Sequence, residues 1–176
     1  RYGSKATLWI IPIILPLLTY TTFHLVARFG SNGQLDKMGF KYERLKFLLV
    51  LLMSALASYI LFAVKEQTTA LPAVIPGLIG LLFAVFGNYF PVLKQNSYIG
   101  VKTPWTLKSE VVWNKTHKMA GQYWFAGGLI IFVSSLFLNH ATSTILLLVV
   151  TVVISIIPIT FSYLEYQRLT KSDQSI

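Results

Sequence analysis

The side chains best suited to chemistry lie in one part of the sequence, residues 94–120 (the motif segment). Six of them are predicted to form one polar and aromatic patch that binds a partner, a lipid headgroup or a peptide: Lys102, Thr103, Trp105, Trp113, Thr116 and His117. His117 is the only member that titrates near neutral pH. The alternative assigns the tryptophans to the aromatic belt of a membrane interface, the lysines to the headgroup layer and His117 to a hydrogen-bonded anchor.

Signatures of common enzyme and metal sites are absent from the sequence. It contains no H-E-x-x-H, G-x-S-x-G, Walker or G-x-G-x-x-G pattern, and three histidines without a cysteine suggest no zinc site. We therefore expect no catalytic residue, metal or cofactor. A membrane enzyme acting on lipid or envelope substrates remains the alternative, because His117 lies beside lysines; a toxin-exporting transporter is a further alternative.

The second half of the motif segment is predicted to be a helix. Ser109 is a plausible N-cap. Trp113, His117, Ala120 and Trp124 recur at helical spacing and so share one face, which predicts an amphipathic interfacial helix. The first half is predicted to be irregular, because Gly100 and Pro104 interrupt it and Pro104 biases the preceding residue toward an extended conformation.

The elements around the motif segment are strongly apolar. Only 12% of the 176 residues are charged, against about 25% in soluble domains. Five uncharged stretches are each about long enough to cross a bilayer as a helix: Leu8–Ala27, Phe47–Val64, Leu71–Leu93, Gly121–Leu138 and Ile145–Leu164. The predicted fold is therefore all-α, a polytopic bundle of five transmembrane helices. The absence of charge from these stretches argues against ion-coupled transport.

The distribution of charge predicts the orientation. With five spans, one side carries 12 Lys and Arg and the other carries three. The positive-inside rule puts the richer side, with the motif segment, in the cytoplasm of a cell-membrane protein. The quoted N-terminus is then outside and the C-terminus cytoplasmic. The net charge of +9 also favours contact with anionic lipids, with no direct binding of nucleic acid.

Three stretches in and around the motif segment resemble the signature of the SdpI family of bacterial membrane proteins. They are Gly87–Pro91 (GNYFP), Lys94–Leu107 (KQNSYIGVKTPWTL) and Val112–Gly121 (VWNKTHKMAG). Lys102 departs from the arginine expected in this family, and a lysine does not form the bidentate pairs of an arginine. The signature and the patch together give nine predicted partner-binding residues: Asn88, Asn96, Lys102, Thr103, Pro104, Trp105, Trp113, Thr116 and His117. Asn88 is predicted to be buried, either in this site or in an interhelical hydrogen bond.

The resemblance implies a domain organisation and a function. The expected parts are the end of an N-terminal module with its second transmembrane helix (1–29), a flexible cytoplasmic linker (30–46), a transmembrane core with the motif segment (47–165) and a cytoplasmic tail (166–176). One upstream helix is expected to be missing, which would make six. The implied function is immunity to a secreted peptide toxin, together with a receptor role that holds a cytoplasmic DNA-binding autorepressor at the membrane.

Overall fold

The computed structural model describes residues 10–30, 39–65 and 71–173, and within them the secondary structure is entirely helical. The elements are α2 (Ile10–Leu25), the π-helical turn η1 (Val26–Gly30), α3 (Phe40–Lys65), α4 (Leu71–Tyr89), the 3₁₀ turn η3 (Phe90–Val92), α5 (Pro104–Lys108), α6 (Glu110–Ser135) and α7 (His140–Asp173). The predicted all-α class is confirmed for these residues. Continuous apolar runs favour helices because a helix satisfies its backbone within one segment.

Three helical segments are long and apolar enough to cross a membrane, judged by length and composition over the described residues: Phe40–Lys65, Val74–Val92 and His140–Lys171. The other two predicted spans correspond to helices α2 and α6, which are not among these three segments. Helix α2 has 16 described residues, and the predicted start of its span at Leu8 lies outside the described part. Helix α6 carries charged side chains in its first three turns. The number of five spans therefore stays a prediction.

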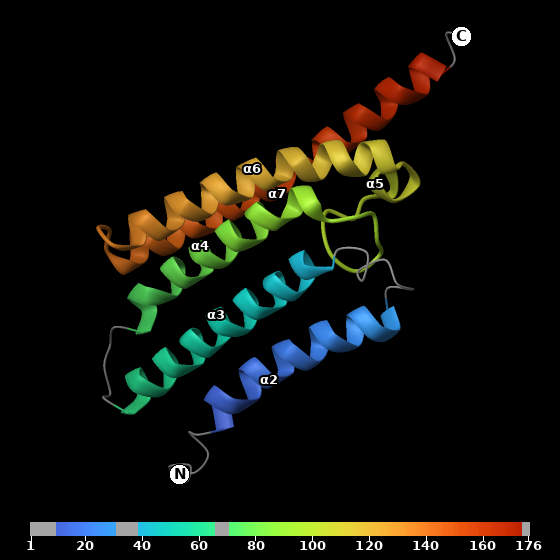
Figure 1. The fold of residues 1–176 in the computed structure, drawn as a ribbon. Coiled ribbons are helices and arrows are strands. Elements are labelled where there is room, and N and C mark those ends of the chain that lie inside the picture. Colours follow the sequence, from blue (N-terminus) through green and yellow to red (C-terminus); the bar gives the residue numbers. More distant parts are fainter. Residues whose placement is uncertain (1–9, 31–38, 66–70, 174–176) are drawn as a thin grey trace.

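The long helices run side by side in one bundle (Figure 1). Helix α2 packs against α3, α4 packs along α6, and α7 covers α6 and part of α4. The loop from Leu93 to Thr103 (loop 93–103) and α5 lie together at the end of the bundle where α4 ends and α6 begins (Figure 1). Helix α5 of the motif segment packs against both α6 and α7.

Glycines bring the backbones of α4 and α6 into direct contact. Gly80 and Gly87 on α4 face Gly128 and Gly121 on α6. A Cβ at Gly80 would lie 2.7 Å from the Gly128 carbonyl oxygen, and a Cβ at Gly121 would lie 2.7 Å from the Gly87 carbonyl oxygen. Small residues at such positions let helices approach closely, which is the usual basis of packing between membrane helices.

The structure corrects the predicted linker over 30–46. Residues 31–38 lie outside the described part, but α3 already begins at Phe40. Tyr42 and Leu45 are buried, and the Tyr42 hydroxyl donates a hydrogen bond to the Phe23 carbonyl of α2. The start of α3 is therefore a packed element. Sequence reasoning missed this because the charges between these apolar residues obscured the buried face.

Lys46 shows how α3 places a charge at a packed position. Its side chain is buried, its Nζ lies 2.7 Å from a Glu43 carboxylate oxygen, and it sits over the Tyr20 ring of α2. Helix α7 continues to Asp173 and projects beyond the rest of the bundle (Figure 1), so the described part of the predicted tail is helical.

Candidate functional site

Asn96 shapes the beginning of loop 93–103. Its Oδ1 accepts hydrogen bonds from the backbone N–H groups of Tyr98 and Ile99, both at 2.8 Å. Its Nδ2 donates to the carbonyls of Lys94 at 2.8 Å and Ile99 at 3.2 Å. The side chain is buried, so these bonds satisfy the amide where water is scarce. Asn96 therefore holds the turn together from inside.

Two threonines form the start of α5. Thr103 is extended, as Pro104 requires, and forms a capping box with Thr106. The Thr106 hydroxyl donates to the Val101 carbonyl at 2.8 Å. The Thr103 hydroxyl lies 3.0 Å from that of Ser162 on α7, and both residues are buried. This pair fastens the motif segment to α7.

Trp113 and His117 hold the loop onto α6. The Trp113 indole N–H donates to the Leu93 carbonyl at 2.8 Å. The backbone N–H of Val101 donates to His117 Nε2 at 2.9 Å, so the ring proton is on Nδ1, which lies 2.9 Å from the Trp113 carbonyl. The two rings stack with centroids 3.9 Å apart. His117 is therefore an anchor with both ring nitrogens engaged.

Burial governs the charge of His117. Desolvation lowers its pKa from 6.5 to about 4, and the hydrogen bond to the Trp113 carbonyl opposes that shift in part. The ring is neutral at pH 7. A neutral ring is required here, because only an unprotonated Nε2 accepts the hydrogen bond from Val101.

We expect the protein to lose stability as the pH falls from 6.5 toward about 4. In this window the unfolded chain binds a proton that the buried His117 ring resists, and the loss approaches about 3 kcal/mol. Thermal unfolding in detergent from about pH 8 down to about pH 4.5 measures it. Replacing His117 by Gln should remove this part of the slope. An unchanged slope in His117→Gln would contradict the assignment.

The nine predicted site residues do not share one surface. Five are buried and serve the interior of the motif segment: Asn96, Thr103, Trp113, Thr116 and His117. Thr116 Oγ1 has no hydrogen-bond partner among the described residues. Lys102 and Pro104 are exposed, and Trp105 is half-buried. Asn88 is also exposed, which corrects the prediction that it is buried. The predicted shared face of Trp113, Ala120 and Trp124 is confirmed. This face packs against other parts of the protein, whereas the prediction placed it at a membrane surface.

An apolar cavity of about 570 Å³ lies beneath loop 93–103. Its aromatic walls come from α2, α4, η3 and α6 and consist of Phe23, Phe86, Phe90 and Trp124. Loop residues 98–103 and three residues of α7 complete the lining. The indole N–H of Trp124 donates to the Ile154 carbonyl at 3.0 Å, which fixes that wall. This cavity could not be predicted from the sequence, because its walls come from six separate elements.

A separate groove, of about 350 Å³, lies between α5 and the projecting part of α7. Trp105 packs against Tyr163 in it with ring centroids 5.1 Å apart. The remaining lining residues are polar or aromatic: Tyr166, Gln167, Thr170 and Lys171. Trp105 is thus the predicted site residue that contributes an aromatic surface to an open groove.

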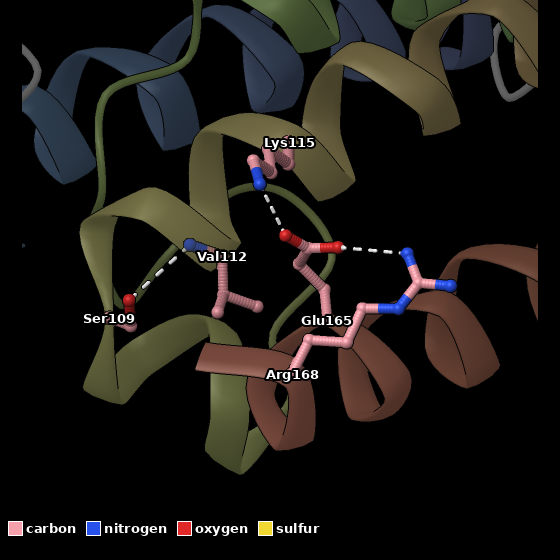
Figure 2. Close-up of polar contacts among 5 residues, drawn as sticks. All are labelled: Ser109, Val112, Lys115, Glu165 and Arg168. Atoms are coloured by element: carbon pink, nitrogen blue, oxygen red, sulfur yellow. Dashed lines mark hydrogen bonds and ion pairs between the residues drawn. The ribbon is translucent and has the colours of Figure 1, made fainter. Parts of the chain in front are cut away.

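A buried acid fastens α6 to α7 (Figure 2). Glu165 is 6% exposed, forms a hydrogen-bonded ion pair with Lys115, and lies 3.8 Å from Arg168. Figure 2 also shows the Ser109 hydroxyl accepting from the Val112 N–H, which confirms Ser109 as the N-cap of α6. The sequence could not pair Lys115 with Glu165, because 50 residues separate them.

Apolar helices, three of them long enough to span a membrane, and a hydrogen-bonded loop at one end define a helical membrane protein. The model of the SdpI/YfhL protein family matches residues 92–162, from the end of η3 to Ser162, the α7 partner of Thr103. "Immunity protein SdpI" of Bacillus subtilis (strain 168) is 30% identical over 172 residues, which is 97% of this chain and 79% of that protein. This chain belongs to the SdpI/YfhL family, as its signature predicts. No solved structure matches it.

Proposed function

We propose that this chain is a membrane immunity protein, which protects a bacterial cell from a secreted peptide toxin. The observation that carries the proposal is the 30% identity with an immunity protein over 97% of the chain. The enzyme alternative loses its motivation, because His117 is buried and neutral and uses both ring nitrogens to hold backbone groups.

Expression in toxin-sensitive cells tests the immunity function. Cells that carry the chain in their membrane are expected to survive toxin concentrations that kill cells carrying an empty vector. Membrane levels are measured in parallel by immunoblotting. Unchanged killing at a confirmed membrane level would contradict the proposal, and efflux of toxin from proteoliposomes would favour the transporter alternative.

The finer proposal is a receptor that holds a cytoplasmic autorepressor. It requires five spans with the motif segment in the cytoplasm, which the excess of 12 basic residues over three supports. We place the docking surface in the groove between α5 and α7, because Trp105 offers an aromatic anchor there and Lys171 an exposed charge. Helix α7 projects from the bundle at this point (Figure 1).

Replacing Trp105 by Ala is expected to reduce repressor recruitment to membranes about tenfold, because anchoring tryptophans carry a large share of interface energy. Co-sedimentation of the repressor with membrane vesicles measures it. Phe137→Ala is the matched control, since Phe137 is 81% exposed beyond the opposite end of α6.

The orientation that the receptor proposal requires is tested separately. The variant Ser97→Cys of this cysteine-free chain should react with an impermeant maleimide only in opened cells. Equal recruitment by Trp105→Ala and Phe137→Ala, or labelling of Ser97→Cys in intact cells, would contradict the receptor proposal.

A further inference from the structure

The cavity beneath loop 93–103 combines an apolar interior with a single cation. Lys102 is the only charged residue among the described residues that line it. Its Nζ donates to the Ser97 carbonyl at 3.3 Å, and within the described ranges no carboxylate forms a salt bridge with it. The side chain is exposed, so its charge is available to a ligand seated in the cavity. The chemistry required of that ligand is an apolar body with one negative group.

The position of the cavity makes it accessible to lipid. Its walls include residues of α4 and α7, both apolar enough to cross a membrane. Ile159, on α7, is 47% exposed and lines the cavity, so the cavity reaches the apolar exterior of that helix. Trp124 and Lys102 lie in the same lining, and aromatic and basic residues are typical of the depth where acyl chains meet headgroups.

The cavity offers little to a polypeptide. A peptide would bring backbone N–H and C=O groups that need partners in an apolar site. The hydroxyl of Thr103 is already engaged by Ser162 and by the Thr106 backbone N–H. An acyl chain has no polar group to satisfy, and a cavity of about 570 Å³ is within the range of small-ligand sites.

We propose that this cavity binds one acyl chain of an anionic glycerophospholipid, with the lipid phosphate paired to Lys102. The bound lipid fills the space between loop 93–103 and α7. This inference is independent of the immunity function, because it rests on the cavity and its single cation.

Native mass spectrometry of the purified protein tests the proposal. The protein is mixed in detergent with equal amounts of phosphatidylglycerol and phosphatidylcholine. The wild-type protein is expected to retain one phosphatidylglycerol in preference to phosphatidylcholine. Lys102→Gln should reduce that preference about fivefold, which is the contribution of one lysine near an anionic headgroup. Lys118→Gln is the control, since it removes an exposed charge of α6 that does not line the cavity.

A second pair of variants tests the apolar part. Ser155 lines the cavity, and Ser155→Leu should fill it and lower the retention of both lipids. Val152→Leu is the control, because Val152 is exposed on the same helix and does not line the cavity. Circular dichroism confirms folding, and Ile159→Trp at the cavity margin replaces Ser155→Leu if the latter fails to fold. Three outcomes would overturn the proposal. The wild-type protein retains the two lipids equally, the cavity-filling variant retains as much lipid as the wild-type protein, or a peptide co-purifies in place of lipid.

Discussion

Replacing Gly87 by Ala is expected to lower the melting temperature of the protein by about 10 °C, through a loss of about 3 kcal/mol. A Cβ at position 87 would lie 2.2 Å from the backbone nitrogen of Phe125 and 2.8 Å from the carbonyl oxygen of Gly121. Both atoms belong to the backbone of α6, which has no rotamer to change. The helices α4 and α6 must therefore separate, and every contact along their shared face weakens.

Gly77 on the same helix supplies the matched control. A Cβ there would meet Ser135 Oγ at 2.5 Å, the end of a side chain that can rotate. Alanine also has the higher helix propensity, so Gly77→Ala should shift the melting temperature by no more than about 2 °C. Circular dichroism melts in one detergent compare the two variants. Similar melting temperatures for Gly87→Ala and Gly77→Ala would show that the backbone contact does not carry the packing of α4 on α6.

The presence of the helices and the N-cap of α6 follow from the sequence, because these signals are local, whereas α3 and α7 extend beyond their predicted apolar stretches. Uncharged apolar runs indicate helices, and the predicted cap at Ser109 depends on residues within one turn. The shared face of Trp113, His117 and Ala120 follows from helical periodicity. Periodicity identifies which residues share a face but not what covers that face. The prediction of an interfacial helix was therefore incomplete: these three residues are buried against the protein.

The candidate site depends on contacts between distant parts of the chain. Val101 meets His117 across 16 residues, and Thr103 meets Ser162 across 59. No local pattern encodes such pairs, so a surface patch and a buried scaffold give similar sequences. The family resemblance points to a segment that the family model also matches, and the hydrogen bonds separate its buried anchors from the exposed Lys102. The pairing of glycines on α4 with particular glycines on α6 could not be predicted for the same reason, because it depends on the register of two helices.

Gly100 makes the fit between loop 93–103 and α6 possible. Its φ is +120°, a conformation that side chains rarely adopt. A Cβ there would lie 2.2 Å from His117 Nε2, the atom that accepts the hydrogen bond from the neighbouring Val101. A side chain at this position therefore adds backbone strain, a collision with the ring and the loss of a buried hydrogen bond.

Gly100→Ala is expected to destabilise the protein by about 3 kcal/mol, of which backbone strain supplies only part. Gly39→Ala is the comparison for a positive φ without a collision, because Gly39 has a φ of +52° and nothing lies within 4 Å of a Cβ built on it; its cost should be about 1 kcal/mol. Thermal unfolding of both variants, alone and combined with His117→Ala, measures the coupling. Since His117→Ala removes the colliding ring, Gly100→Ala should cost about 1–2 kcal/mol less in that background. Additive effects of Gly100→Ala and His117→Ala would mean that the ring and the loop are not coupled through this contact.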